Sequence, residues 1–419
     1  MKRYSKVLVY LLMVLPTLLM QSCLKDQEDF FDDSAANRMQ QYLDETQKIL
    51  ASSEQGWLVE YYPHRNLRYG GYVFIMQFDE AQVKVRSEFS GDASLCETSY
   101  YKMTSDNGPV ISFDTYNKLL HVFATPNGQM YQGYDGDFEF VIDSYNDNEV
   151  VLHGKRTHNV IHMYRLNEDG EKYLEKVIAK STELKYAGAK GQIGSSENVV
   201  GLVDTDSKEL ELSDGSNIVK TSFCYTDTGI SLYQPVTMGG MTFSSLDYDP
   251  ATEMYTSTGH DGQTITLKAG YPDGWKSYYD LVGQYTVRGT AVKVNVVADE
   301  ENKTFILRNL SESGDVKAEY NEKFGSINIS VQEVWSGKWS DGTPGCLWLC
   351  AYNDDYVTWS TDILFKGRNV VSGDKYNIQL RNGEYLSFAL FQFEGATPTG
   401  DGLAGTEYKF PDPFVLVRN

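Results

Sequence analysis

Apolar and polar residues alternate along most of this chain. Side chains two positions apart share one face of a strand, and apolar residues have that spacing in the segments 57–61, 72–78 and 138–142. Polar residues occupy the opposite face in segments such as 83–86 and 292–296. Turn-forming pairs separate these runs, among them Gly70-Gly71, Asn127-Gly128, Asp214-Gly215, Gly239-Gly240 and Asn382-Gly383. The pattern predicts a mainly β protein of antiparallel sheets, in sandwich or barrel-like domains.

Two segments have the three-and-four-residue spacing of a helix instead. In the first, apolar residues recur from Met39 to Leu50, with Asp33 or Ser34 available as N-cap and Gly56 to end the helix. The second covers about residues 171–183. No strand–helix–strand alternation occurs, so the sequence argues against a parallel α/β fold.

The N-terminus has the parts of an export signal. Lys2, Arg3 and Lys6 precede an apolar stretch, Val7–Met20, which is shorter than the roughly 20 residues that a membrane-spanning helix needs. We predict a signal peptide at residues 1–22 that is removed. The segment before Cys23 resembles a bacterial lipobox, and this resemblance implies a lipid attached to Cys23, whereas a leader cysteine without function is the alternative.

The chain is strongly acidic. It carries 58 Asp and Glu against 37 Lys and Arg, a formal charge of −21, and loss of the three basic leader residues makes the mature chain −24. This charge excludes nucleic acid as a partner and disfavours anionic lipid, so membrane association is expected through the lipid anchor. Residues 23–33 are an acidic tether, in which Lys25-Asp26-Gln27-Glu28 resembles the surface-export signal of Bacteroidota lipoproteins.

About 397 residues remain after the leader, which is too many for one hydrophobic core. We predict a linker at residues 187–198, because glycine and serine are frequent there. It would separate an N-terminal domain at 34–186 from a middle β region at 199–270. A second break near Gly270-Tyr271-Pro272-Asp273-Gly274 would precede a C-terminal β domain at 278–419.

Candidate chemistry is sparse. Three histidines, His153, His158 and His162, fall in one strand-like segment, where a zinc site is disfavoured because His158 and His162 would stand about 13 Å apart on a strand. The sequence lacks a nucleophile elbow, a phosphate loop and a dinucleotide fingerprint, so it predicts no catalytic residue, no metal site and no cofactor. Asp135-Gly136-Asp137 and Asp204-Thr205-Asp206 could bind calcium, but ordinary turns fit them better.

Cysteines give no disulfide scaffold. Cys96, Cys224, Cys346 and Cys350 are interpreted as small buried side chains, with one long-range disulfide as the alternative.

Aromatic residues supply the one positive signal for a binding site. The chain has 30 tyrosines and 6 tryptophans, and aromatic rings on a sheet can stack on the apolar faces of sugars. Trp335 and Trp339 flank Ser336-Gly337-Lys338, a stretch that cannot easily bury both rings. We predict that they form an exposed ligand platform, and packing into a sandwich core is the alternative.

Several motifs together resemble a known family. They are Phe30-Phe31-Asp32-Asp33-Ser34-Ala35, then Gly56-Trp57-Leu58-Val59-Glu60-Tyr61-Tyr62-Pro63, then Gly70-Gly71-Tyr72, and Gly154-Lys155-Arg156-Thr157 before Met163. The combination resembles a family of Bacteroidota lipoproteins classified only as a domain of unknown function, over most of the chain. That family has no assigned catalytic residues. Its members accompany outer-membrane nutrient-import systems, so the resemblance implies an accessory role in uptake.

The sequence therefore predicts a surface lipoprotein of the outer membrane that binds a polysaccharide or peptide beside a transporter complex. An extracellular hydrolase is one alternative, and it would bring acids or histidines together in a concave pocket. A structural or partner-docking subunit is the other, and it would present a broad apolar patch.

Overall fold

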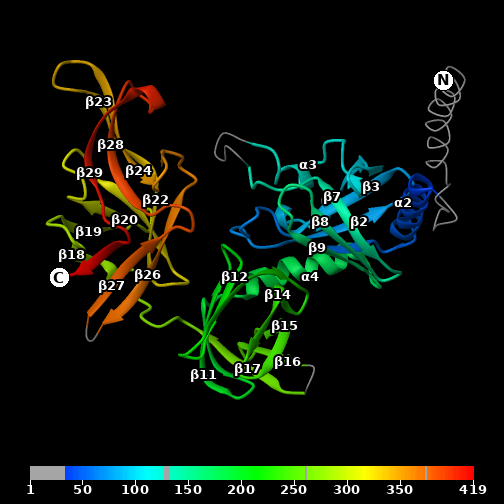
Figure 1. The fold of residues 1–419 in the computed structure, drawn as a ribbon. Helices are drawn as coiled ribbons and strands as arrows, with labels where there is room; N and C mark the ends of the chain where they lie inside the picture. Colours follow the sequence, from blue (N-terminus) through cyan, green and yellow to red (C-terminus); the bar gives the residue numbers. More distant parts are fainter. Residues whose placement is uncertain (1–33, 127–132, 260–261, 373–374) are drawn as a thin grey trace, which may run out of the picture.

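The computed structural model describes residues 34–126, 133–259, 262–372 and 375–419. The predicted signal peptide at 1–22, Cys23, the tether at 23–33 and the turn at Asn127-Gly128 lie outside these residues. Figure 1 shows three β units, with the N-terminal and C-terminal units side by side and a barrel that bridges them. All their strand pairs are antiparallel, which confirms the predicted fold class.

The N-terminal unit is one open sheet of nine strands with helices beside it. Its sheet order is β4-β3-β2-β1-β9-β8-β7-β6-β5. Its elements are α2 (Ala35–Ala51), β1 (Trp57–Tyr61), β2 (Tyr72–Phe78), β3 (Gln82–Ser87), η2 (Glu88–Ser90), β4 (Glu97–Tyr100), β5 (Lys102–Ser105), β6 (Pro109–Ser112), α3 (Lys118–His121), β7 (Glu139–Tyr145), β8 (Glu149–Gly154) and β9 (Val160–Arg165).

Both ends of helix α2 follow from local sequence. The Ser34 hydroxyl accepts a hydrogen bond from the backbone N–H of Asn37 at 3.2 Å, which is the predicted N-cap. Leu43 and Leu50 are buried on the face toward the sheet. The indole N–H of Trp57, the first residue of β1, donates to the Leu50 carbonyl at 2.9 Å. This bond satisfies one of the carbonyls that a helix leaves unpaired at its C-terminus.

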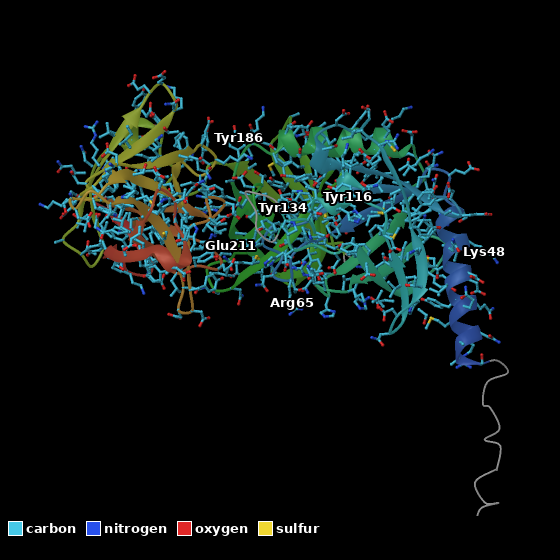
Figure 2. The ribbon with its side chains drawn as sticks, turned by 90° about the horizontal axis from the view of Figure 1, so that it is seen from above. Lys48, Arg65, Tyr116, Tyr134, Tyr186 and Glu211 are labelled. Carbon is cyan, nitrogen blue, oxygen red and sulfur yellow. The ribbon has the colours of Figure 1, made fainter. Side chains whose placement is uncertain are left out.

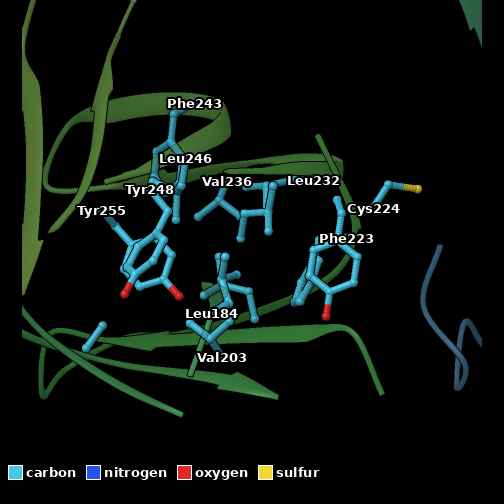
Figure 3. Close-up of a cluster of buried hydrophobic side chains, with 14 of the residues drawn as sticks. Leu184, Val203, Phe223, Cys224, Leu232, Val236, Phe243, Leu246, Tyr248 and Tyr255 are labelled. Carbon is cyan, nitrogen blue, oxygen red and sulfur yellow. The ribbon is translucent and has the colours of Figure 1, made fainter. Parts of the chain in front are cut away.

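The middle unit is a closed barrel of eight strands entered through a helix, and β10 pairs with β17 to close it. Its elements are α4 (Gly170–Glu183), β10 (Gly188–Ile193), β11 (Ser196–Asp204), β12 (Glu209–Ser213), β13 (Ile218–Tyr225), β14 (Gly229–Met238), β15 (Met241–Asp249), β16 (Met254–Thr258) and β17 (Thr264–Gly270). Figure 3 shows its buried side chains, among them Phe223, Leu232 and Leu246.

The predicted linker at 187–198 is wrong, because these residues form β10 and the start of β11. Glycine is needed there for packing: a Cβ on Gly191 would overlap the carbonyl oxygen of Thr266 on β17. Close approach of two backbones explains the glycine-rich composition. The connector between units is the second predicted break, at residues 271–278, between β17 and the short helix that opens the C-terminal unit.

The C-terminal unit combines a second closed barrel with a sheet that extends from it. The barrel contains β18 (Gly283–Val287), β19 (Lys293–Asp299), β20 (Thr304–Arg308), β21 (Val316–Asn321), β22 (Ser326–Ser330), β26 (Leu364–Ser372), β27 (Lys375–Arg381) and β30 (Phe414–Arg418). The sheet contains β23 (Gln332–Lys338), β24 (Pro344–Tyr352), β25 (Val357–Thr358), β28 (Ser387–Glu394) and β29 (Leu403–Lys409). The 3-10 helices η3 (Tyr279–Leu281) and η4 (Gly400–Gly402) complete the unit.

One turn of the barrel contacts both other units. This turn begins at Asp204, the last residue of β11, and runs to Lys208, just before β12. It is called the hub turn below. On one side, the Lys208 ammonium forms an ion pair with Glu88 of the N-terminal unit, and both side chains are less than 10% exposed. It also donates to the Gly71 carbonyl at 2.7 Å and lies 3.7 Å from the centre of the Tyr72 ring. A buried ammonium is thus surrounded by groups of the neighbouring unit.

Gly71 fits this contact because it has no side chain. A Cβ there would collide with the Cys224 sulfur on β13 and with the Tyr62 ring. The Gly71 N–H donates to the Phe223 carbonyl at 3.0 Å, so the two backbones meet directly. Helix α4 fills the rest of the seam, and its Leu174 and Val177 belong to one hydrophobic core that includes barrel residues and Val73 and Ile75 of β2. Both faces of β2 are therefore buried over most of its length.

On its other side, the hub turn contacts the C-terminal unit. The Asp204 carboxylate lies 3.1 Å from the Lys366 ammonium and 3.0 Å from the Arg368 guanidinium, both on β26. The Lys323 ammonium donates to the Thr205 hydroxyl. Burial alone would raise the pKa of Asp204, but the two cations outweigh it and lower the pKa to about 2. A buried acid thus stays ionised because the neighbouring unit supplies the positive charge.

We expect Lys208→Met to lower the free energy of unfolding by about 3–5 kcal/mol, because it leaves the Glu88 carboxylate buried without a cation. The double variant Lys208→Met/Glu88→Leu removes both charges and should recover most of that loss. Lys220→Met is the control, since Lys220 pairs with Glu211 with its side chain 56% exposed and should contribute at most about 1 kcal/mol. Urea unfolding followed by circular dichroism measures all three, and a double variant no more stable than the single variant would contradict this account.

The ion pairs of Asp204 predict a pH dependence. Its pKa is lower in the folded chain than in the unfolded chain, so the stabilising contribution is complete above about pH 4 and disappears as the pH falls through about 2. The shift corresponds to about 2 kcal/mol. We expect Asp204→Asn to reduce the acid sensitivity of unfolding in this window relative to the wild type, measured by urea unfolding at a series of pH values. Asp273→Asn, which breaks an exposed pair with Lys190, should leave the pH profile unchanged.

Candidate functional site

The two predicted platform tryptophans lie at the free end of the sheet of the C-terminal unit. Trp335 is on β23, and Trp339 opens the turn that connects β23 to β24. The backbone N–H of Trp339 donates to the Thr343 carbonyl at 2.8 Å, which closes the turn. The structure brings the two indoles together, with ring centres 4.7 Å apart and ring planes inclined by 39°.

A pair of glycines makes room for these rings. Gly337 of β23 lies directly opposite Gly345 of β24. A Cβ on Gly345 would overlap the Trp339 indole nitrogen, and a Cβ on Gly337 would lie 2.8 Å from the Trp335 ring. Each indole therefore occupies the space that a side chain of the strand pair would fill. Trp335 also packs against the core of the C-terminal unit. Both side chains stay partly exposed.

Polar residues continue the same face of the sheet. On β28, Glu394 lies opposite Gly345 and Gln392 lies opposite Leu347. Residues directly opposite each other in antiparallel strands share a face, so both side chains lie on the face of the tryptophan pair. The patch thus combines two aromatic rings with a carboxylate and an amide.

The opposite face of this sheet is covered by its own hydrophobic cluster. Cys346, Cys350, Phe391 and Phe393 are buried there, and Trp348 packs half-buried against them. All four described cysteines are free thiols, so the long-range disulfide is absent among them. Cys224 is also buried as predicted, whereas Cys96 is partly exposed, which corrects the prediction for that residue.

The histidine segment does not assemble a metal site. His162 on β9 lies with its Nδ1 2.8 Å from Glu149, and His153 on β8 lies 2.8 Å from Asp143. His158 is exposed in the turn between these strands. Within the part of the chain that the structure describes, no group of three or more histidine, cysteine or acidic side chains is placed to hold a metal ion.

Both acidic pairs considered for calcium have protein partners. Asp137 accepts hydrogen bonds from the backbone N–H groups of Arg156 at 2.6 Å and Thr157 at 3.1 Å, and Asp135 pairs with the Arg156 side chain. Asp204 belongs to the hub turn. The Gly154-Lys155-Arg156-Thr157 motif therefore serves to anchor the β8–β9 turn.

The described residues enclose a small void and also form a surface cavity. One is a void of about 10 Å³ inside the core of the N-terminal unit, lined by apolar side chains such as Val59, Phe140 and Met163. The other is a surface cavity of about 320 Å³ in the C-terminal unit, formed by the β27–β28 turn and the segment before β30. Its residues are far apart in the sequence and follow no spacing motif, so sequence reasoning missed it.

Cys23, the predicted site of lipid attachment, lies outside the described residues. In the described part of the chain, no helix has the length and apolar character needed to cross a bilayer.

Comparisons with known proteins give family membership without an activity. No curated protein matches the chain. Among solved structures, the chain is 11% identical to a crystal structure from Bacteroides uniformis that is provisionally named a 6-phosphogluconolactonase. That alignment covers 85% of this chain and 83% of the other, with a TM-score of 0.10.

Two family models match, and both are described only as domains of unknown function. DUF4987 matches residues 258–380, from the last strands of the middle barrel into the C-terminal unit. DUF4302 matches residues 27–250, which is more than half of the chain and includes the N-terminal sheet and the barrel up to β15. The expected membership in a family of unknown function is confirmed: this chain belongs to the family described as domain of unknown function DUF4302.

Proposed function

We propose that this protein is a lipid-anchored lipoprotein of the cell surface that binds a glycan or peptide as an accessory component of an outer-membrane nutrient-import system. The leader and Cys23 support the anchor, and the acidic charge of −21 supports attachment through lipid rather than through basic side chains. Binding, rather than catalysis, is proposed as its role.

The observation that carries the proposal is the pair of partly exposed indoles that pack over Gly337 and Gly345. An indole face attracts the C–H faces of a sugar ring and also the side chains of proline or aromatic residues. The neighbouring Gln392 and Glu394 supply an amide and a carboxylate for hydroxyl or N–H groups of the same ligand. Both ligand classes of the proposal fit this combination of an apolar ring surface with polar neighbours.

The position of the platform relative to the N-terminus fits a tethered binding protein. Figure 2, in which Lys48 marks helix α2, shows that helix at the end of the molecule farthest from the C-terminal unit. Ser34 caps this helix, eleven residues after Cys23. An extended chain of that length spans at most about 39 Å. A lipid on Cys23 would thus hold the N-terminal unit near the membrane, with the platform directed away from it.

We expect Trp335→Ala and Trp339→Ala each to weaken ligand binding about tenfold, which corresponds to about 1.4 kcal/mol of lost ring contact. Gly345→Val should have a similar effect without removing either ring, because its side chain would displace the Trp339 indole. The measurement is isothermal titration of residues 24–419 with glycans and peptides found in an array screen.

Trp348→Phe is the matched control for these variants, since Trp348 lies on the opposite face of the same sheet, beside Cys346 and Cys350. Its binding should equal that of the wild type. Saturable binding that survives both alanine substitutions would show that the platform is not the site. Absence of saturable binding, together with copurification with a transporter, would contradict ligand capture and favour a docking subunit.

A further inference from the structure

The cavity of about 320 Å³ in the C-terminal unit has the size of a small-molecule site. One wall is the turn between β27 and β28, which includes Arg381, Glu384 and Tyr385. The other wall is Asp412 with Pro413, just before β30. The site therefore lies where two segments separated by 25 residues meet, at one end of the second barrel.

Charged groups that are not paired with each other line this cavity. Arg381 and Asp412 both border it, yet no ion pair joins them. The Asp412 side chain has no hydrogen-bond partner among the described residues. With the Gln379 amide turned so that its oxygen faces Arg381, the guanidinium donates to that oxygen at 2.8 and 3.0 Å, which leaves three of its five N–H donors. The cavity thus offers a free carboxylate as an acceptor and a partly free guanidinium as a donor.

A third charged side chain on the rim is already neutralised by neighbours. The Glu384 carboxylate forms an ion pair with Arg68 of the N-terminal unit and accepts a hydrogen bond from the Tyr356 hydroxyl at 2.7 Å. The Tyr385 ring is 8% exposed and meets the Tyr356 ring edge-on, with centres 5.8 Å apart. The rim is therefore held in place from both units, whereas Arg381 and Asp412 are exposed to solvent and form no ion pair with each other.

These two groups restrict the chemistry of the ligand. A hydroxyl group donates to a carboxylate and accepts from a guanidinium, so a polyhydroxylated ligand satisfies both without carrying charge. An anion would meet the Asp412 carboxylate and a chain of net charge −21. A simple cation would leave the donors of Arg381 without an acceptor. Neutral hydroxyl-rich ligands fit both walls.

We propose that this cavity is a binding subsite for one unit of a neutral saccharide, with Asp412 and Arg381 as the residues that recognise its hydroxyl groups. This inference rests on the proposed function and narrows its ligand class from glycan or peptide to neutral glycan. Strand β28 connects the subsite to the platform: it begins at Ser387, next to the cavity, and ends at Glu394 beside the tryptophan pair. Seven strand steps of about 3.3 Å separate the two places by roughly 23 Å.

The test measures binding of residues 24–419 to neutral hexasaccharides of glucose, xylose and mannose, to an oligogalacturonate of the same length, and to a set of neutral hexapeptides. Asp412→Asn and Arg381→Gln remove one recognising charge each and keep similar shapes. We expect each to weaken binding of the preferred neutral hexasaccharide at least tenfold, by isothermal titration. Asp315→Asn is the control, because it makes the same chemical change in an exposed pair of another turn and should leave affinity unchanged. Thermal unfolding checks that each variant is folded.

The outcomes separate this inference from the proposed function. Binding that is lost in Trp335→Ala and unchanged in both Asp412→Asn and Arg381→Gln would overturn the subsite and leave the platform standing. Binding that is lost in the cavity variants and unchanged in Trp335→Ala would support the subsite and remove the platform. A preference for peptide or oligogalacturonate over every neutral hexasaccharide would overturn the ligand class. No saturable binding of any probe would contradict both proposals.

Discussion

The arrangement of the three units depends on one short turn that carries two buried charges of opposite sign. Asp204 at the start of the hub turn faces two cations of the C-terminal unit, and Lys208 at its end faces a carboxylate of the N-terminal unit. A buried charge without a partner costs several kcal/mol. Moving either neighbouring unit away from the barrel would therefore leave Asp204 or Lys208 without its partner. The turn therefore fixes the position of each unit relative to the barrel. The platform and the cavity both lie on the C-terminal unit, so their orientation depends on the same turn.

Local features of the fold could be predicted because their causes are local. Helix α2 follows from Ser34 as its cap and from apolar residues at helical spacing, and the strands follow from alternation. The barrel closure could not be read in this way, because it depends on pairing between β10 and β17, which are some 70 residues apart. The same closure explains the false linker: Gly191 is small because a neighbouring backbone leaves no space for a side chain, and composition alone does not distinguish this reason from flexibility.

The candidate sites also differ in whether their residues are close together or far apart in the sequence. The tryptophan pair comes from one hairpin, so its two residues are close together in the sequence. The position of Gly345 on β24 beneath the rings could be recognised only from the strand register. The cavity joins Arg381 to Asp412 and needs the fold to bring them together. The acidic pairs that begin at Asp135 and Asp204 have a spacing that could bind calcium, but Asp135 and Asp204 instead form ion pairs within the protein. A spacing motif therefore identifies candidate groups, and the pairing of strands decides which of them are free.

The closure of the middle barrel also determines which pieces of this protein can exist alone. The DUF4302 match ends at residue 250, before β16 and β17, whereas the barrel closes only when β17 pairs with β10. A fragment that stopped at the family boundary would leave β10 and β15 as two open edges with unpaired backbone groups. Open edges of this kind add strands from other molecules and lead to aggregation. The unit of folding is therefore longer than the unit recognised by sequence comparison, and it ends at Gly270.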